Sequence, residues 1–355
     1  MNTVAADIVI IGAGLTGLLT AFRLKDHGLE VKIVDARNRI GGRIYTKYSD
    51  QFAPTEMGAT WLGQKHTALV ELLEELGLPT FVQQLGSRAI YEAISTSPHQ
   101  LVTLPPNTDP SYRIKEGSSA LINTLAEKLD QRDIYLNQVV EGIIEEGGDL
   151  KVSTSNLQFK AAKVVSTLPP VLFAQSITVS PRLPKALIEV AKQTHTWMGD
   201  SIKVSLAYES PFWREEKWSG TIVSNVGPIP EMYDHADFTD SRFALKGFFN
   251  GSYYSVSKAE RLEMVLTQLQ KYYGNQVRDF LTYEELVWRN EPFTYSPYEQ
   301  HVLPHQNNGH TVFREAYLGG KLFIAGSETA PAFPGYMDGA VRSGEFVAQT
   351  ILNNL

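Results

Sequence analysis

The sequence has no cysteine among its 355 residues. This absence excludes disulfide bonds, thiolate metal sites, cysteine nucleophiles and a thioether link to a cofactor. The eight histidines show no metal-ligand pattern, since His301 and His305 have Pro304 between them and no carboxylate cluster beside them. A G-x-S-x-G motif is also missing. We therefore expect neither a metal centre nor a serine hydrolase of that type.

The chain has no excess of positive charge and no long hydrophobic run. Its net charge of -7 argues against nucleic acid as a partner. No apolar run approaches the roughly 18–20 residues that a membrane span requires, and the N-terminus lacks the basic region of a signal peptide. With 43% hydrophobic and 20% charged residues, the composition is that of a globular protein with a sizeable core. We expect two domains, no membrane partner and a cytoplasmic location.

A glycine-rich turn near the N-terminus is the most informative feature that is present. Residues 7–11 form a continuous apolar run, which is typical of a parallel strand covered on both faces. Gly12, Gly14 and Gly17 follow in the spacing G-x-G-x-x-G, and residues 15–25 are predicted to form a helix. In such a motif the first glycine makes the turn, the second lets a pyrophosphate approach the backbone, and the third allows helix and strand to pack closely.

The acidic residue that accompanies this motif in dinucleotide-binding proteins is also in place. Residues 30–34 are a second predicted strand, and Asp35 ends it. Its carboxylate can accept hydrogen bonds from a ribose 2′-OH, and its charge disfavours the 2′-phosphate of NADP. The pattern predicts dinucleotide binding; the alternative is a glycine-rich turn in an α/β fold without a cofactor. No lysine follows Gly17, so the turn is not a Walker loop.

The segment after the second strand distinguishes FAD from NAD. DARNRIGGRIYT places Gly41 and Gly42 between Arg39 and Arg43, where a simple NAD dehydrogenase would begin a helix. A second glycine turn brings more backbone against a cofactor, and arginine suits bidentate phosphate contacts. EMGATWLG, residues 56–63, follows a polar loop. This order of motifs favours FAD over NAD. The alternative role for Arg43 is a surface ion pair.

The motifs at both ends of the chain resemble those of the flavin-dependent amine oxidases, the family of monoamine, polyamine and L-amino-acid oxidases. GAGLTGL, VDARNRIGGR and EMGATWLG resemble its N-terminal FAD motifs, and GSETAPAFPGYMDGAVRSGE resembles its final one. The resemblance covers roughly residues 5–80 and 115–355. It implies an α/β protein with a Rossmann-like FAD-binding domain and a smaller α+β substrate domain with a mixed or antiparallel sheet. The FAD-binding domain would comprise residues 1–80, 115–192 and 291–355, and the substrate domain residues 81–114 and 193–290.

The same resemblance implies which residues contact the cofactor. A final helix that begins near Tyr336 or Met337 would direct its N–H groups at the flavin, where reduction places negative charge. Val140 matches a position whose backbone contacts adenine, although a plain strand residue is the alternative. The predicted cofactor-binding residues are Gly12, Ala13, Gly14, Leu15, Thr16, Gly17, Asp35, Ala36, Arg37, Gly42, Arg43, Gly58, Ala59, Thr60, Trp61, Val140, Trp288, Gly326, Glu328, Gly335, Tyr336, Met337 and Ala340.

Three residues are implied in catalysis: Tyr336, Tyr298 and Lys203. The two tyrosines match the aromatic cage that surrounds the substrate amine in the family, with Tyr295 as a competitor for the place of Tyr298. Lys203 matches a lysine held through water to flavin N5, where its charge could stabilise superoxide during reoxidation. Packing roles for the tyrosines and a solvent-facing strand position for Lys203 are the alternatives. Pro297 occupies the position of covalent flavin attachment, so non-covalent FAD is expected.

The resemblance implies oxidation of a neutral amine. Hydride would pass from the α-carbon to flavin N5, an imine would leave, and O2 or another acceptor would reoxidise the flavin, with H2O2 as the product from O2. Only about 35 loop-like residues lie between Pro79 and Lys115, where larger members build part of the substrate cavity, so the pocket should be open or completed by a second subunit in a homodimer. The alternatives are a desaturase or a NAD(P)H-oxidising flavoprotein of the renalase type, and a binding protein that carries FAD without catalysis.

Overall fold

The apolar N-terminal segment forms a central strand, β1 (Asn2–Ile11), in a computed structural model that describes residues 2–355. β1 pairs in parallel with β2 (Val31–Val34) and β12 (Leu157–Ser166). Successive side chains of a strand point to opposite faces, so Ile8 belongs to one hydrophobic core and Val9 to another. Both faces of the last four residues of the strand are therefore covered, which explains why residues 8–11 are continuously apolar.

The first sheet has nine strands and is parallel at its centre. Its main path runs β13 (Thr178–Ser180), β10 (Val140–Glu146), β11 (Asp149–Thr154), β12, β1, β2 and β9 (Ile134–Tyr135), with β20 (Leu322–Ile324) paired to β12 and β19 (Ala316–Tyr317) paired to β20. The β10–β11 and β11–β12 pairs are antiparallel. The chain thus returns to this sheet from three distant parts of the sequence.

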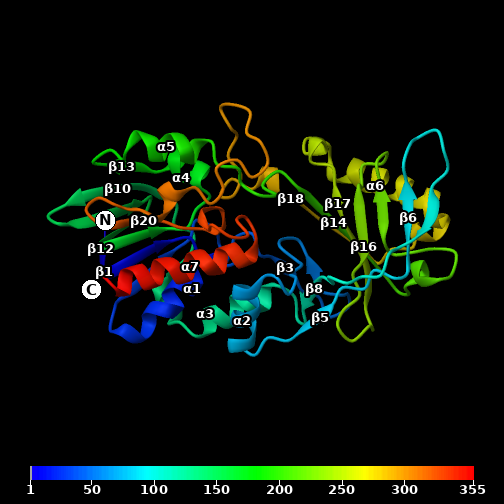
Figure 1. Ribbon diagram of the computed structural model, residues 1–355, viewed down its shortest axis with the longest axis horizontal. Coiled ribbons are helices and arrows are strands. Elements are labelled where there is room, and N and C mark those ends of the chain that lie inside the picture. The colour runs from blue at the N-terminus through cyan, green and yellow to red at the C-terminus, as the bar shows by residue number, and fades with distance from the viewer. Residues whose placement is uncertain (1) are drawn as a thin grey trace.

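Helices cover both faces of the first sheet (Figure 1). One core lies against α1, α3 and α7, and the other against α4 and α5. The α-helices are α1 (Leu15–Leu24), α2 (Thr67–Glu75), α3 (Ser119–Glu127), α4 (Pro170–Ser176), α5 (Lys185–Lys192), α6 (Lys258–Tyr273) and α7 (Met337–Leu352). Short 3₁₀ helices span Lys25–His27, Gln131–Asp133, Phe212–Arg214, Gly251–Tyr253, Asn275–Arg278, Trp288–Asn290, Thr311–Arg314 and Ser327–Thr329.

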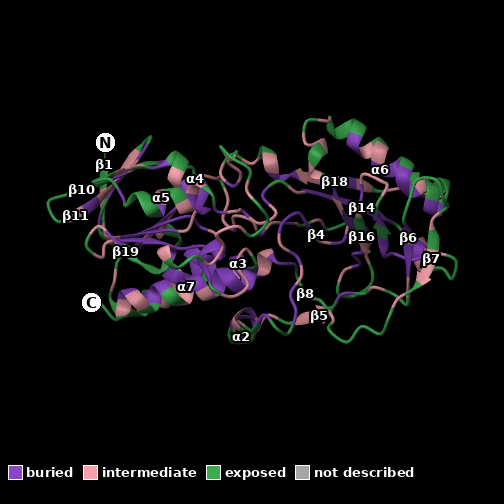
Figure 2. Cartoon of the chain, turned by 45° about the horizontal axis from the view of Figure 1, so that its top comes forward, coloured by how far each residue is buried: buried purple, intermediate pink, exposed green. Residues whose placement is uncertain are grey.

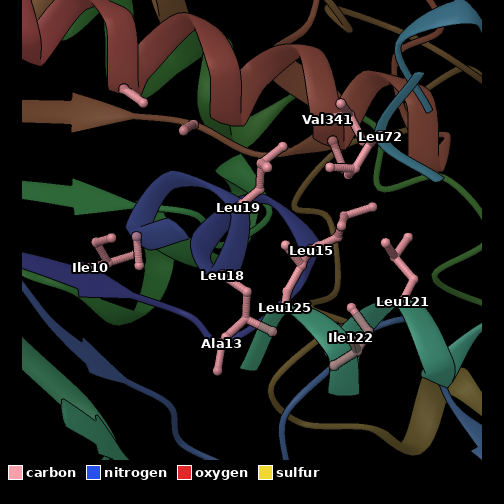
Figure 3. Packing of buried hydrophobic residues seen from close by; sticks show 14 of the residues in the cluster. Ile10, Ala13, Leu15, Leu18, Leu19, Leu72, Leu121, Ile122, Leu125 and Val341 are labelled. Carbon is pink, nitrogen blue, oxygen red and sulfur yellow. The ribbon is translucent and has the colours of Figure 1, made fainter. Parts of the chain in front are cut away.

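The first and last long helices pack against each other, although more than 300 residues separate them. Thr16 in α1 donates a hydrogen bond from Oγ1 to the carbonyl of Ala340 in α7, with a length of 3.0 Å. Gly344 lets the helices approach, because a Cβ there would lie 3.1 Å from the Thr16 carbonyl. Figure 3 shows Leu19 of α1 and Val341 of α7 in the core beside this contact. The two ends of the chain are thereby held together.

The second sheet has seven strands and is mainly antiparallel. Its order is β18 (Thr282–Val287), β14 (Ile202–Tyr208), β17 (Phe243–Phe249), β16 (Glu231–Asp234), β15 (Ile222–Ser224), β6 (Arg88–Glu92) and β7 (Gln100–Thr103). β15 and β6 are parallel, so the sheet is mixed, and α6 packs against it around a third core. Two short ribbons, β3 (Thr46–Lys47) with β4 (Thr55–Glu56) and β5 (Thr80–Val82) with β8 (Tyr112–Ile114), lie between the lobes (Figure 1).

The predicted fold class is confirmed: a Rossmann-like α/β part is joined to an α+β part with a mixed sheet. The loop-like stretch between Pro79 and Lys115 supplies β6 and β7 to the second sheet and β8 to a ribbon. Figure 2 shows buried residues in the inner parts of both sheets, such as β14, and exposed residues on many of the loops at the rim. Between residues 2 and 355, no helix combines the length and the apolar character that a membrane span requires.

Candidate active site

A cavity of about 350 Å³ lies where the two sheets meet. Its walls come from the glycine-rich turn after β1, the Gly41–Arg43 turn, the segment after β12, strands β14 and β17, and the start of α7. The carboxyl ends of β1 and β12 therefore point at the cavity, which is where parallel α/β sheets bind ligands. Its size falls within the usual range of about 300–1,000 Å³ for small-molecule sites.

Most of the residues predicted to form the site line this one cavity. They are Gly12, Gly14, Leu15, Thr16, Asp35, Arg37, Gly42, Arg43, Gly58, Ala59, Thr60, Trp61, Lys203, Trp288, Gly335, Tyr336, Met337 and Ala340. The predicted residues Ala13, Gly17, Ala36, Val140, Tyr298, Gly326 and Glu328 are not among the lining residues. Two of these residues bind a residue that lines the cavity: the Ala13 N–H donates to Asp35, and Glu328 accepts from Arg43. Val140 packs in the core of the first sheet.

The sequence analysis missed a further group of lining residues. They are Gly41, Ile44, Thr167, Leu168, Pro169, Trp197, Met198, Ser201, Phe248, Phe293, Thr294 and Ser327. A signal for Thr167–Pro169 was present, because this segment follows the carboxyl end of a strand in a parallel sheet. Trp197 and Phe248 gave no local signal, since their positions depend on how the second sheet meets the first.

Two helix N-termini meet at the cavity without side-chain caps. Gly14 is the N-cap of α1 and Tyr336 the N-cap of α7, and neither N-cap makes a side-chain hydrogen bond. The first N–H groups of a helix have no partner within it and carry a partial positive charge. A Cβ on Gly14 would meet no protein atom within 4 Å, so the space before α1 is open. These two ends are suited to hold a ligand with negative charge at two places.

Asp35 lies at the edge of the cavity with only 6% of its surface exposed. Its two carboxylate oxygens accept hydrogen bonds of 2.8 Å from the N–H groups of Ala13 and Arg37. A carboxylate has about four acceptor positions, so two remain for a ligand hydroxyl. The Asp35 carboxylate is thus hydrogen-bonded to the glycine-rich turn, which fixes its position before any ligand binds.

Arg43 forms a bidentate ion pair with Glu328. Its guanidinium nitrogens lie 2.5 and 2.8 Å from the two carboxylate oxygens, and Nη2 also donates to Ser327 at 2.9 Å. The Glu328 side chain is fully buried, and a quarter of the Arg43 side chain is exposed. Burial alone would raise the pKa of Glu328, but the charge and hydrogen bonds of Arg43 outweigh it and hold that pKa below its usual value. The arginine fork thus binds a protein carboxylate and not a free phosphate.

Tyr336 faces a tryptophan and not the predicted tyrosine. The ring centroid of Trp197 is 5.8 Å from that of Tyr336, and both rings line the cavity. His305 stacks on the other side of Trp197 at 4.2 Å. The Tyr298 hydroxyl instead accepts a 2.8 Å hydrogen bond from the Thr196 N–H. Tyr298 therefore supports the loop that carries Trp197 in this structure.

Lys203 reaches the cavity from β14 and is only 5% exposed. Its Nζ lies 4.2 Å from the ring centroid of Phe248 and 5.4 Å from that of Trp61. Burial lowers the pKa of Lys203 to about 8, because the desolvated ammonium is disfavoured. A largely apolar wall thus contains one amine whose charge state changes near neutral pH.

Across residues 2–355 there is no group of three or more His, Asp or Glu side chains placed to hold a metal ion. The cavity offers backbone N–H groups, aromatic rings, the Asp35 carboxylate and the Lys203 amine.

Comparison with known proteins identifies relatives of this arrangement. The family model described as flavin containing amine oxidoreductase matches residues 15–107 and 98–352. A probable flavin-containing monoamine oxidase A of Dictyostelium discoideum is 25% identical, and the match covers 98% of each chain. The flavin-containing amine oxidase B of Sus scrofa is 24% identical over 98% of this chain and 86% of its own. A putrescine oxidase structure with bound putrescine superposes with a TM-score of 0.86 at 23% identity, covering 99% of this chain and all of the other.

Proposed function

The chain belongs to the family of flavin-containing amine oxidoreductases, and from this premise we propose that its cavity holds FAD without a covalent bond and oxidises an amine with O2 as the acceptor. The protein is an oxidoreductase that acts on the CH–NH or CH–NH2 group of amines with a flavin. The finer features, namely the residues that carry the reaction and the mode of FAD attachment, belong to the proposal. So do the domain boundaries given above, a cytoplasmic location and a homodimer.

The observation that carries the proposal is the pair of uncapped helix N-termini at one cavity. FAD has two parts that favour such ends, a pyrophosphate and a flavin ring that gains negative charge on reduction. The N-terminus of α1, next to Gly12 and Gly14, suits the pyrophosphate, and Asp35 suits a ribose hydroxyl. The N-terminus of α7 suits the flavin. Bound there, the cofactor would accept the two electrons removed from the amine.

The residues at the other end of the cavity would bind and orient the amine. The aromatic rings of Tyr336, Trp197, Trp61 and Phe248 line this part of the cavity and give it an apolar wall. An aromatic face attracts an amine through its quadrupole. Lys203 adds one positive charge to this wall when it is protonated. We assign the aromatic role opposite Tyr336 to Trp197, and Tyr298 the role of supporting its loop.

Anaerobic mixing with amines tests the proposed function. Primary amines, secondary amines and amino acids are each added to the flavin-loaded protein, and bleaching near 450 nm is followed. At least one class is expected to bleach the flavin, and Tyr336→Leu is expected to slow this by about tenfold, because one aromatic contact to an amine is lost. The variant should bind flavin like the wild type when its spectrum is measured before mixing. Bleaching by NADH or NADPH alone would favour the alternative enzyme class, and no bleaching by any donor would favour a non-catalytic role.

Denaturation tests the mode of cofactor attachment. The sequence offers no cysteine, and Pro297 stands where covalent members of the family attach flavin. We expect unfolding in guanidinium chloride followed by ultrafiltration to leave all flavin absorbance in the filtrate. Mass spectrometry of the unfolded chain should give the mass of the polypeptide alone. A flavin adduct on the chain would show that non-covalent binding is wrong.

A further inference from the structure

A second lysine, Lys246, lies buried beside Lys203 and has no role in the site described so far. In the antiparallel pair of β14 and β17, Lys203 is opposite Phe248 and Ser205 is opposite Lys246. Residues two apart on a strand share a face, so all four side chains lie on one face of the second sheet. These strands are adjacent in that sheet, next to its edge strand β18 (Figure 1). Lys246 is 0% exposed and sits behind the cavity wall, whereas Lys203 is part of the wall.

The amino groups of the two lysines converge on the same tryptophan. Lys246 Nζ lies 4.3 Å from the ring centroid of Trp61, and Lys203 Nζ lies 5.4 Å from it. Lys246 Nζ also bonds to Thr60 Oγ1. The Thr60 hydroxyl donates its own proton to the Gly58 carbonyl at 3.1 Å, so in the bond to Lys246 it is the acceptor. One N–H of Lys246 is thereby used, and the geometry leaves its nitrogen free to accept a bond on another side.

No carboxylate lies close enough to neutralise two ammonium groups. Within residues 2–355 no carboxylate oxygen is within 4.0 Å of the amino group of Lys203 or Lys246. The nearby acid Glu56, on β4, accepts bonds from the Ser118 N–H at 2.5 Å and from Thr46 Oγ1 at 2.9 Å. Two desolvated like charges side by side repel strongly, so such a pair keeps only one proton over a wide pH range.

The other charged and titratable groups around the pair do not change this balance. Arg113, on β8, and His235, after β16, are both buried, and Arg113 donates a 2.9 Å hydrogen bond to His235 Nδ1. Burial and the Arg113 charge hold the pKa of His235 well below its usual value, so Arg113 alone adds a positive charge. Glu231, on β16, is exposed to solvent and accepts a bond from Tyr233. Burial, followed by the charge of Lys203, holds the pKa of Lys246 well below its usual value. Burial raises the pKa of Glu56.

We propose that Lys203 and Lys246 hold a single proton between them, with Lys203 as the ammonium at the cavity wall and Lys246 as the neutral amine that accepts its hydrogen bond. Lys246 is then a positioning residue, because it fixes both the direction and the charge of Lys203. Its consequence for amine oxidation rests on the proposed function, whereas the shared proton is a property of the protein itself.

The test is a pH titration of the two amines by NMR in the flavin-loaded protein labelled with [15N,13C]lysine. The two signals are assigned by their loss in Lys203→Met and Lys246→Met. In the wild type, Lys203 is expected to titrate near pH 8, and Lys246 to remain neutral below that midpoint. In Lys246→Met the Lys203 midpoint is expected to fall by about one pH unit, the shift that corresponds to the loss of one net hydrogen bond. In Lys203→Met the Lys246 midpoint is expected to rise, because the neighbouring charge is gone.

A matched control is available at the surface. Lys217 Nζ lies 4.1 Å from the Trp218 ring, but its side chain is 66% exposed, and Lys217→Met should leave the Lys203 midpoint unchanged. A Lys203 midpoint that stays or rises in Lys246→Met would overturn the proposal. So would two protonated amines at pH 7 in the wild type, a result that needs no variant to fold. The titration requires no turnover, so it tests the shared proton separately from the proposed function. If the proton is shared but no amine bleaches the flavin, only the proposed function is wrong.

Discussion

Replacing Arg43 with methionine is expected to lower the free energy of unfolding by about 3 kcal/mol at pH 7, because it leaves a buried carboxylate without its partner. Glu328 is fully buried, and Arg43 makes both of its ionic hydrogen bonds. The measurement is urea unfolding followed by tryptophan fluorescence. Arg23 provides the control, since it also binds two carboxylates, those of Glu75 and Glu345, but both are about 41% exposed. Arg23→Met should cost no more than about 1 kcal/mol.

The loss of unfolding free energy in Arg43→Met should depend on pH, and the sign of this dependence follows from the pKa of Glu328. In the wild type the folded-state pKa of Glu328 is depressed, so the pair contributes stability above the unfolded-state pKa and loses it as pH falls through the folded-state pKa. In Arg43→Met burial should dominate and raise the pKa of Glu328 instead. That variant should lose stability as pH rises above the unfolded-state pKa, which is about 4.3. The difference in unfolding free energy between this variant and the wild type should therefore be larger at pH 7 than at pH 4.

A second substitution separates charge from packing at this pair. Arg43→Met combined with Glu328→Gln removes the buried charge and should recover part of the stability that Arg43→Met loses. The recovery should be greatest at pH 7, where the carboxylate would otherwise be ionised. If Arg43→Met is no less stable than Arg23→Met, the ion pair does not hold the 3₁₀ helix Ser327–Thr329 against the Gly41–Arg43 turn.

Two alanine substitutions in the glycine-rich turn are expected to separate folding from flavin binding. A Cβ on Gly17 would lie 2.0 Å from the Gly12 carbonyl oxygen and 3.2 Å from Ile10 Cγ2. The first of these contacts is with backbone, so α1 would have to move away from β1. We expect Gly17→Ala to lose flavin binding altogether and to melt at a lower temperature even without the cofactor. The 450 nm absorbance per protein and circular dichroism melting measure the two effects.

Gly14→Ala provides the matched comparison. A Cβ at this position would meet no protein atom within 4 Å, and the residue has an extended conformation that alanine adopts freely. The apoprotein should therefore melt like the wild type. Because the added methyl group would occupy the space before the α1 N-terminus, flavin affinity should fall by about tenfold or more. Unchanged affinity in Gly14→Ala would show that the pyrophosphate does not lie there.

Much of the cofactor half of the site could be predicted because its signals are local. The run 7–11, the spacing of Gly12, Gly14 and Gly17, and Asp35 after the next strand encode a strand, turn, helix and strand within about 30 residues. The structure places this unit at the cavity, with Asp35 tied to the turn. Tyr336 was implied by the resemblance to the flavin-dependent amine oxidases, and the structure places it at the same cavity.

The substrate half of the site could not be predicted in the same way. The sequence analysis paired Tyr336 with Tyr298, but the ring that faces Tyr336 is Trp197, on a loop that Tyr298 supports. Arg43 was predicted to suit a phosphate or a surface ion pair, and it binds Glu328, 285 residues away. No sequence signal indicated a site position for Lys246, because a lysine in a strand is ordinarily exposed.

The amino-acid sequence by itself therefore determined the glycine-rich turn, whose spacing lies within one strand–helix unit. Motifs at both ends of the chain that resemble a known family indicated the fold class and the family. The tertiary structure decided which aromatic ring lies near Tyr336, which carboxylate pairs with Arg43 and which second amine lies beside Lys203. The physical reason is that these neighbours depend on the register of β14 against β17 and on the packing of α7 against α1. A one-residue change in that register would turn Lys246 to the opposite face of the sheet without altering any local motif.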